Sequence, residues 1–226
     1  MVELTLYSNI DTSRTWWVAW MCRELGVPFN NERSEGFLDP SWKTPEYLAI
    51  NPSGLMPSIK DGDFVLWESM AINLYFAKKY SHGRLCPESL EGEALASQWS
   101  FWAITRLEIP FLVVGASKRN LAPGSEMENY FLKHIPMWTS SEVARSLSVL
   151  NGPFDVLNAK LSSSPYLLGA EFSVADLNVA MVMARNQFAQ IDLSGRPNLV
   201  NWLRECWSRP ACPRKSVLLE GLERMH

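Results

Sequence analysis

The stretch NPSGLMPSIKDGDFVLWESMAIN, residues 51–73, restricts the fold more than any other part of the chain. It opens with a turn signal and then places Pro57 inside a segment that otherwise reads as a strand, residues 56–60. Proline has no backbone N–H, so it belongs at a sheet edge, at a bulge or at the first position of a strand. A cis Met56–Pro57 bond would turn the Met56 backbone outward, where an extended peptide could pair with it. A trans proline at the start of an ordinary strand is the alternative interpretation.

The second half of this stretch predicts a hairpin followed by a helix. Asp61-Gly62 is a strong signal for a tight turn between strands at 56–60 and 64–67. Glu68 and Ser69 then precede a helical pattern of apolar residues, in which Ser69 is the expected N-cap. The N–H groups of a helix start attract a carboxylate, and an adjacent acid can accept from an ammonium group. The pair could therefore hold an α-amino acid head. The alternative interpretation is a plain N-cap preceded by a surface acid.

The first part of the chain reads as a layer of strands and helices. An alternating pattern predicts a strand at 3–8, and a helical apolar stripe follows at 13–25. A second strand is expected near 29–35, and residues 36–50 read as a loop with a short helix. With the hairpin and the helix from Ser69, this order predicts a parallel strand–helix–strand unit that a hairpin and a helix complete, which is an α+β arrangement.

The remainder of the chain predicts helices only. Residues 81–90 have the composition of a linker, and one helical seam follows, interrupted at Pro110. One or two further helices are expected in residues 125–162, with a break at Asn151-Gly152-Pro153.

The strongest local signal in this half is a capping box. Ser173 fits the N-cap and Asp176 fits the third helical position. Phe172 and Leu177 occupy the two positions of a hydrophobic staple. The helix that follows is apolar on nearly all sides, which predicts that it is buried. The last helices are expected near residues 197–208 and after Pro213.

Composition argues against several classes of function. The 226 residues are 47% hydrophobic, which is enough for a substantial core, and the net charge is only −3. Because phosphate binding needs a concentrated basic face, nucleic acid is not an expected partner. No apolar run is long enough for a membrane span and no signal-peptide pattern is found, so a cytoplasmic protein is expected. The 4 cysteines lack C-x-x-C spacing and the 3 histidines are scattered, so neither disulfides nor a metal site is expected.

The chain resembles the cytosolic glutathione transferase superfamily over nearly its whole length. The resemblance is carried by NPSGLMPSI, by DGDFVLWESMAINLYFAKKY with its Glu-Ser pair at a helix start, and by FSVADL in the helical half. It implies a thioredoxin-like domain in residues 1–80, a linker in 81–90 and an all-α domain in 91–226. It also implies a detoxifying enzyme of the cytoplasm, serine-type and bacterial-like, that forms homodimers.

The resemblance gives the opening stretch a ligand. In this family the residue before the cis proline, here Met56 followed by Pro57, pairs its backbone with the cysteinyl part of glutathione. The pair formed by an acid or glutamine and a serine, here Glu68 and Ser69, holds the γ-glutamyl head. An extended peptide with an amino acid head is also what the residues by themselves suggest, and glutathione is both.

The resemblance also implies the other ends of the site. Many members have a lysine two residues before the cis proline, where this chain has Leu55, so Lys43 is expected to contact the glycyl carboxylate instead. The electrophile is expected to bind between the domains, against the first helix of the second one. The candidates for this pocket are Trp99, Trp102 and Phe111, with Arg106 to anchor an acidic group.

Catalysis in the family depends on a donor that stabilises the glutathione thiolate near the start of the first helix. Lowering a thiol pKa from ~8.5 to about 6.5 requires ~2.7 kcal/mol. One hydrogen bond to the charged sulfur, aided by the helix start, supplies roughly this much. Comparison with the family favours Thr12 or the adjacent Ser13, where serine is usual, and Tyr7 and the Asn9 amide are the alternatives. Cys22 lies on an apolar stripe, which argues against thiol–disulfide chemistry.

These expectations combine into a glutathione transferase that adds the glutathione thiolate to a small hydrophobic electrophile. Glutathione is the co-substrate, and no metal is needed. A glutathione-dependent isomerase, dehalogenase or lyase would use the same site. A non-catalytic binding or scaffold protein with the same fold is the alternative from another class, because a fold does not fix a function.

Overall fold

The computed structural model describes residues 4–9, 13–34, 40–118 and 138–225, which form two compact units. The first unit comprises Met1–Ser97 with Pro210–Pro213, and the second comprises Gln98–Arg209 with Arg214–His226. The division by contacts falls inside helix α4 (Leu90–Ala103). Each unit has its own core and is described by itself.

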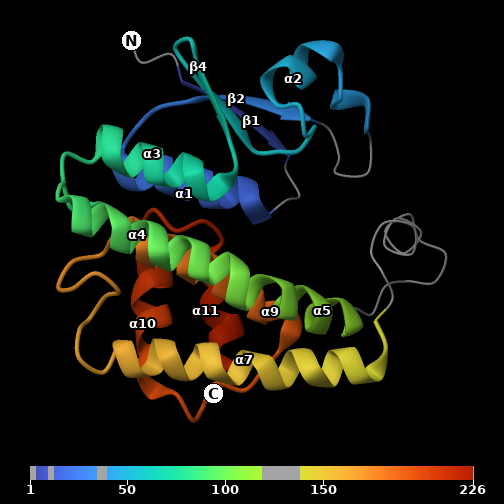
Figure 1. Ribbon diagram of the computed structural model, residues 1–226, viewed down its shortest axis with the longest axis vertical. Helices are drawn as coiled ribbons and strands as arrows, with labels where there is room; N and C mark the ends of the chain where they lie inside the picture. Colours follow the sequence, from blue (N-terminus) through green and yellow to red (C-terminus); the bar gives the residue numbers. More distant parts are fainter. Residues whose placement is uncertain (1–3, 10–12, 35–39, 119–137, 226) are drawn as a thin grey trace. The chain divides into compact units, whose positions relative to one another are not determined.

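The first unit is built on a mixed four-stranded sheet in the order β2-β1-β3-β4 (Figure 1). Strand β1 pairs with β2 in parallel and with β3 antiparallel, and β3 pairs antiparallel with β4. The strands are β1 (Leu4–Asn9), β2 (Asn30–Ser34), β3 (Ser58–Asp61) and β4 (Phe64–Trp67). The helices are α1 (Ser13–Leu25), α2 (Pro45–Ile50) and α3 (Ser69–Tyr80), with a single 3-10 turn, η1, at Pro40–Trp42. The predicted strand–helix–strand unit with a hairpin and a helix is therefore confirmed.

The alternation of β1 decides which helices cover which face of the sheet. Leu4, Leu6 and Ser8 are buried on one face, where α1 and α3 pack against each other (Figure 1). Tyr7 points to the opposite face, and its ring centroid lies 5.7 Å from that of Tyr47 on α2. The sheet is therefore covered on both faces.

The hairpin forms as expected, but its first strand starts later than the sequence suggested. The Met56–Pro57 peptide bond is cis, and the first ladder pair of β3 is Ser58 with Tyr7. Pro57 therefore lies just before a central strand and not within it, which a residue without an N–H requires. Gly62 has φ +62°, a left-handed conformation that suits glycine in this tight turn.

Asp61 joins the hairpin to the last turns of α3. Its carboxylate oxygen Oδ2 accepts hydrogen bonds from Tyr75 at 2.9 Å, Lys79 at 2.7 Å and Tyr80 at 2.6 Å. Burial acts to raise the pKa of Asp61, but the donors outweigh it and hold the pKa below its usual range. Because the folded pKa is depressed, this carboxylate stabilises the fold above its unfolded pKa and loses that effect as the pH falls through the folded pKa.

Replacement of Asp61 with Asn should therefore destabilise the protein by about 2 kcal/mol at neutral pH, or roughly 5 °C in Tm. The difference from the wild type should shrink as the pH falls below about 4, since the wild-type carboxylate then takes up its proton. Thermal melts across pH measure this. Asp63→Asn is the matched control because Asp63 is exposed in the same hairpin turn. A pH-independent difference, or an equal loss in the control, would contradict this role for Asp61.

The second unit is helical throughout its described residues. After α4 a π-helical turn, η2 (Ile104–Glu108), leads into α5 (Ile109–Ser117). The remaining helices are α7 (Ser140–Lys160), α8 (Val174–Met183), α9 (Asn186–Ala189), α10 (Pro197–Ser208) and α11 (Lys215–Glu223). The chain is thus an α+β protein with a thioredoxin-like first part and an all-α second part, as predicted.

Two predicted helix interruptions differ from the structure. Helix α7 continues through Asn151-Gly152-Pro153, so the predicted break is wrong. The fully buried side chains Leu150, Phe154 and Leu157 flank the proline at helical spacing, and their burial offsets the hydrogen bond that Pro153 removes. At Pro110 the chain also stays helical, because the π-helical turn ends just before α5 and proline is tolerated in a first turn.

The predicted capping box forms and ties several segments together. The fully buried Asp176 accepts from the Ser173 N–H at 2.9 Å and the Ser173 hydroxyl at 2.7 Å. It also accepts from the Leu167 N–H and from Trp202 Nε1 on α10, both at 2.9 Å. Helix α8 is buried along its whole length, which confirms the expectation from its uniform apolarity.

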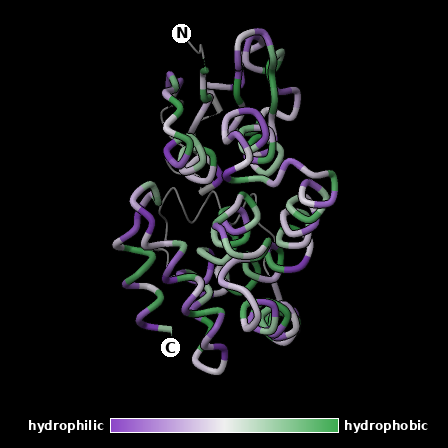
Figure 2. The backbone as a smooth tube through the Cα atoms, turned by 90° about the vertical axis from the view of Figure 1, so that its left-hand side faces the viewer, coloured by the Kyte–Doolittle hydropathy of each residue, from purple (hydrophilic) through white to green (hydrophobic). Residues whose placement is uncertain are grey.

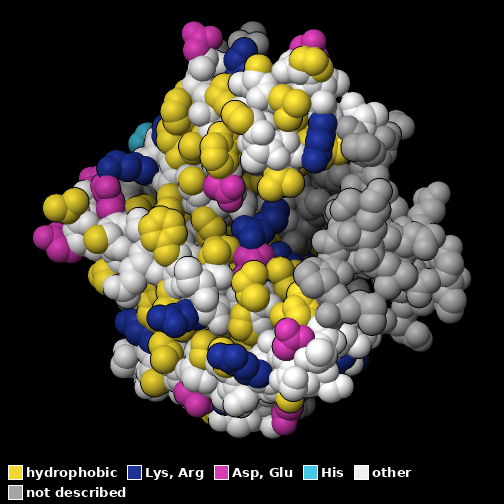
Figure 3. All heavy atoms as spheres, turned by 45° about the vertical axis from the view of Figure 1, so that its right-hand side comes forward, with side chains coloured by type: hydrophobic (Ala, Val, Ile, Leu, Met, Phe, Trp, Pro, Cys, Tyr) yellow, Lys and Arg dark blue, Asp and Glu magenta, His cyan; other side chains and the backbone are white. Residues whose placement is uncertain are grey.

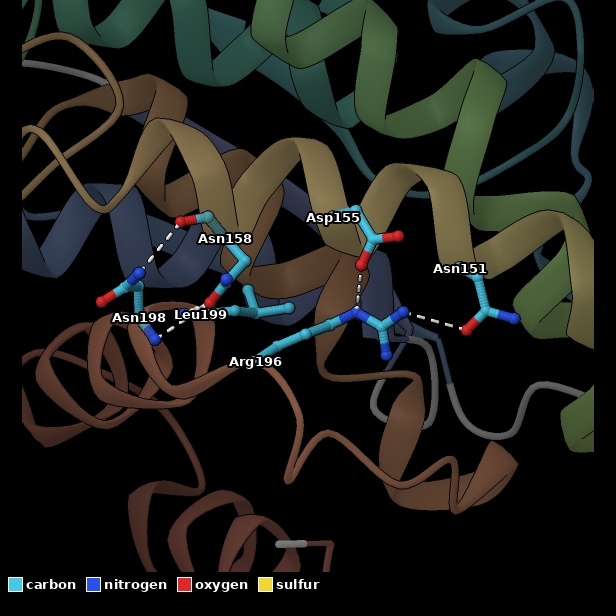
Figure 4. A network of polar contacts seen from close by, with 6 residues as sticks. All are labelled: Asn151, Asp155, Asn158, Arg196, Asn198 and Leu199. Carbon is cyan, nitrogen blue, oxygen red and sulfur yellow. Dashed lines mark hydrogen bonds and ion pairs between the residues drawn. The ribbon is translucent and has the colours of Figure 1, made fainter.

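Helix α7 carries a polar stripe beside its apolar one, and this stripe holds the start of α10 (Figure 4). Asn158 Oδ1 accepts from the N–H groups of Asn198 at 3.0 Å and Leu199 at 3.2 Å, which lie in the first turn of α10. Arg196 donates to Asp155 at 2.8 Å and to Asn151 at 3.0 Å. The orphan donors of one helix start are therefore satisfied from a neighbouring helix.

The structure shows how the charged residues, the apolar residues and the cysteines are distributed. Apolar and polar residues succeed each other along most helices (Figure 2), and charged side chains of both signs occur across the face drawn in Figure 3. Cys22, Cys86, Cys206 and Cys212 are all buried, and none of the four forms a disulfide. Over the part of the chain that the structure describes, no helix has the length and apolarity needed to cross a membrane.

Candidate glutathione site

The first unit contains a cavity of about 160 Å³ at the end of the sheet where β3 begins and α3 starts. It is lined by Arg14, Asn51, Leu55, Met56, Pro57, Glu68 and Ser69. Four of the residues assigned to glutathione binding, Met56, Pro57, Glu68 and Ser69, are therefore brought to one place. Arg14 and Asn51 were not anticipated from the sequence.

The segment before Pro57 is held by hydrogen bonds to one carbonyl group. The Leu55 carbonyl accepts from the Tyr47 hydroxyl at 2.6 Å and from Asn51 Nδ2 at 2.7 Å. Asn51 is buried, and its Oδ1 accepts from the Ser53 N–H at 3.0 Å, which fixes the turn. Met56 thus follows a rigidly held residue and precedes the sheet, so its backbone has a fixed direction next to the cavity.

The helix start beside the cavity differs in one detail from the prediction. Glu68 is the N-cap of α3 and Ser69 is its first helical residue, so the expected N-cap assignment of Ser69 is wrong by one position. Glu68 has φ 74° and ψ 110°, which is not a helical conformation. The helix therefore starts at the residue that follows it, Ser69. Backbone conformations of this kind in non-glycine residues cluster at ligand sites. Glu68 is exposed, whereas Ser69 is buried.

Arg14 brings a positive charge to this helix start. Its Nη1 donates to the Ser69 hydroxyl at 3.1 Å, and its guanidinium carbon lies 4.5 Å from the Trp17 ring centroid. The two partners fix the guanidinium between α1 and α3, within the same cavity. A cation, a hydroxyl and a helix start on one side, with a carboxylate on the other, can hold a zwitterionic amino acid head. Arg14 was missed because its partner is 55 residues away in the sequence.

In the sequence, the candidate catalytic donors belong to β1, to the first residue of α1 and to the segment between them. Thr12 is outside the described residues, and Ser13 is the first residue of α1. Asn9 is the last residue of β1. Burial, with a smaller effect of the Glu32 charge, raises the pKa of Tyr7, whose ring faces α2. Cys22 is buried on α1, and burial raises the pKa of its thiol to about 12, so it remains protonated at neutral pH.

Lys43 is exposed, and it is not one of the residues that line the cavity beside Met56 and Ser69. Its Cδ lies 3.4 Å from the position that a Cβ on Gly54 would take, so its stem packs beside this glycine. Its ammonium nitrogen lies 5.4 Å from the Trp42 ring centroid. The contact with the glycyl carboxylate therefore remains a prediction, although Lys43 reaches the turn that precedes Leu55.

The four residues predicted for the electrophile pocket lie in the second unit in unlike environments. Trp99 is buried and Trp102 half-buried on α4, with ring centroids 5.2 Å apart, and Arg106 is exposed on η2. Phe111 is only 1% exposed, and its ring packs against Phe154 of α7 at 5.7 Å. Phe111 therefore belongs to the core of this unit and is no longer a pocket candidate, because a ligand could not reach it.

No cluster of histidine, cysteine, aspartate or glutamate suited to hold a metal ion occurs among the described residues. The cavity itself offers a fixed backbone segment, a helix start, a guanidinium and a carboxylate.

Comparison with known proteins assigns the family. Residues 2–78 match the model of the glutathione S-transferase N-terminal domain, and residues 125–210 match that of the C-terminal domain. Glutathione S-transferase 3 of Zea mays is 32% identical over 219 residues, covering 93% of this chain and 92% of the maize protein. Glutathione S-transferase GstB of Escherichia coli K12 is 30% identical over 178 residues, covering 77% of this chain and 78% of GstB.

A solved structure has the same fold along nearly the full chain. The theta class glutathione S-transferase of Xanthomonas axonopodis pv. citri, determined with glutathione bound, superposes with a TM-score of 0.78 at 25% identity. The match covers 95% of this chain and 97% of the other. With both domain models, the relatives and this fold in agreement, the chain belongs to the cytosolic glutathione S-transferase superfamily of enzymes.

Proposed function

We propose that the protein binds glutathione in the cavity of the first unit and adds its thiolate to a small hydrophobic electrophile. The observation that carries this proposal is the convergence of Met56, Glu68, Ser69 and Arg14 on one cavity. Glutathione has the matching parts in the matching order, an amino acid head followed by an extended peptide. The bound glutathione in the Xanthomonas structure adds support from a related fold.

The head of glutathione would lie across the start of α3. Its ammonium group pairs with Glu68, and its carboxylate meets the Ser69 hydroxyl, the first N–H groups of α3 and Arg14. The cysteinyl part then pairs with the Met56 backbone in the manner of an added strand. Lys43 approaches the glycyl carboxylate at the far end. The sulfur would thereby point toward the start of α1, where Thr12 and Ser13 follow β1 in the sequence.

The hydroxyl of Thr12 or Ser13 stabilises the thiolate by a hydrogen bond. Loss of this hydrogen bond in a Thr12→Ala, Ser13→Ala double variant should raise the pKa of the bound thiol by about one to two pH units. Conjugation to a chlorodinitrobenzene at neutral pH should fall about 3–25-fold, because a smaller fraction of the thiol is then ionised, and it should recover at alkaline pH, where the thiol ionises unaided. The ultraviolet absorbance of the bound thiolate, followed across pH, measures the pKa directly.

The control for this experiment is Ser216→Ala, an exposed hydroxyl on α11. The two single variants show which hydroxyl acts. An unchanged thiol pKa in the double variant would exclude both residues and leave Tyr7 and Asn9 as candidates.

An isomerase would be recognised by glutathione that is not consumed, and a dehalogenase by the release of halide. Failure to bind glutathione at millimolar concentration would favour the scaffold alternative.

We place the electrophile against α4, at Trp99, Trp102 and Arg106. The half-buried Trp102 and the exposed Arg106 offer an aromatic surface and a positive charge one turn apart.

We also propose a homodimer, because α4 and α5 expose Phe101 and Ile109, each 63% accessible, and β4 exposes Phe64 and Trp67. Sedimentation velocity tests the dimer, which a monomer at micromolar concentration would contradict.

A further inference from the structure

A second cavity of the first unit, of about 290 Å³, lies on the α2 side of the sheet. Its walls include the rings of Tyr7, Trp42 and Tyr47 together with the carboxylates of Glu32 and Glu46. Among the described lining residues there is no lysine or arginine. The cavity therefore combines aromatic surface with negative charge, and neither feature serves the chemistry proposed for glutathione.

The three rings contact one another at steep angles, with Tyr47 between Tyr7 and Trp42. Trp42 meets Tyr47 nearly at a right angle, with an interplanar angle of 78° and a centroid distance of 5.2 Å. Tyr7 is tilted by 57° to Tyr47 at 5.7 Å. The Tyr47 hydroxyl is engaged by the Leu55 carbonyl, so this ring is held in place. The face of an aromatic ring attracts a cation, and alkylated ammonium groups suit such faces because little water must be removed from them.

The charges of the cavity point to the same class of ligand. Glu32 is the cross-strand neighbour of Tyr7 in the parallel pair of β1 and β2, so both side chains lie on one face. Its charge is felt at Tyr7, whose pKa it helps to raise after the larger effect of burial. Glu46, in the first turn of α2, has a pKa lowered by its own backbone N–H and by Thr44, so it is ionised at neutral pH. The Lys43 ammonium lies 5.4 Å from the Trp42 ring centroid, so an organic cation bound at this ring would have to displace it.

This cavity is a poor place for glutathione itself. Glutathione carries two carboxylates and one ammonium group, so its net negative charge would be repelled by Glu32 and Glu46. Met56 lines both cavities, but Arg14, Glu68 and Ser69 line only the first and the three aromatic rings only the second. The two cavities thus share one residue and differ in charge.

We propose that the cavity formed by Tyr7, Trp42, Tyr47, Glu32 and Glu46 binds a small organic cation of the quaternary ammonium class. The aromatic faces would surround the alkylated nitrogen, and the two carboxylates would compensate its charge. The proposal stands apart from the proposed function, because it concerns other residues and a ligand of opposite charge.

Choline and its neutral isostere 3,3-dimethylbutanol test the proposal, because they share shape and differ in charge. Calorimetric titration of the full-length protein should give a Kd near 1 mM for choline, and binding of the isostere at least about 10-fold weaker. Trp42→Leu should weaken choline binding about 10-fold, and Glu32→Gln about 3- to 10-fold. Thermal melts establish that each variant is folded.

The matched controls are Trp67→Leu, an exposed tryptophan on β4, and Glu91→Gln, an exposed acid on α4, neither of which lines the cavity. Both should bind choline as the wild type does. Glutathione titrated into Trp42→Leu shows whether the first cavity is intact. Equal binding of choline and the isostere, no binding of choline at tens of millimolar, or equal losses in the controls would each overturn the proposal.

Discussion

The Asp176→Ala variant is expected to unfold roughly 10 °C below the wild type. The carboxylate is fully buried and accepts hydrogen bonds from Ser173, Leu167 and Trp202, so its removal leaves donors of the loop, the helix start and α10 without a partner. Unmet buried donors cost about 1–3 kcal/mol each, and a partly relaxed site should lose about 3–4 kcal/mol in total. For a chain of this length, that corresponds to the stated change in Tm.

Thermal melts followed by circular dichroism measure this loss. Asp155→Ala is the matched control: this acid also pairs with a neighbouring segment through Arg196, but its side chain is 66% accessible. An exposed ion pair contributes at most about 1 kcal/mol, so the control should change Tm by only a few degrees. Asp176→Asn should fall between the two, since the amide keeps one acceptor oxygen. Equal losses for Asp176→Ala and Asp155→Ala would mean that the buried hydrogen bonds do not hold this unit together.

The Glu68→Gln variant is expected to raise the Kd for glutathione by roughly 10–50-fold. In the proposed complex, Glu68 is the partner of the ligand ammonium group, and a charge-assisted hydrogen bond is worth about 1.5–3 kcal/mol. Glutamine keeps the size of the side chain and removes its charge, so the N-cap conformation at φ 74° should persist. Calorimetric titration with glutathione measures the change.

A second ligand shows whether this loss belongs to the ammonium group. The glutathione analogue that lacks the α-amino group should bind the wild type much more weakly than glutathione does. Glu68→Gln should bind both ligands with similar affinity, because this variant lacks the carboxylate that distinguishes a ligand with an ammonium group from one without it. Glu91→Gln, an exposed acid of α4 in the same unit, should behave as the wild type. If Glu68→Gln still discriminated fully between the ligands, the ammonium group would be held elsewhere.

The elements that the sequence predicted well are those whose signals are local. Strand β4 has the predicted bounds, and helix α3 begins within one residue of its predicted start, because a tight turn precedes the strand and a helical stripe marks the helix. The Ser173–Asp176 capping box is likewise specified within a few residues. The break near Pro153 was wrong because a local rule about proline was overruled by burial of Leu150 and Phe154, which only the folded chain provides.

The site was predictable in part for the same reason. Glu68 and Ser69 are adjacent in the sequence, and Met56 stands beside a proline in a motif, so their roles could be suggested before their positions were known. Arg14 could not, because its contact with Ser69 depends on how α1 and α3 pack. Phe111 was misassigned because an apolar residue on a helix does not reveal whether it faces a cavity or the core.

The most direct test of the account is a crystal structure of the protein with bound glutathione. The account predicts the γ-glutamyl head between Glu68 and Ser69, with its carboxylate also on Arg14, and the cysteinyl amide paired with the Met56 backbone. Its sulfur should lie within hydrogen-bonding distance of the Thr12 or Ser13 hydroxyl. Glutathione bound at another place, or a head group that leaves Glu68 and Ser69 untouched, would contradict it.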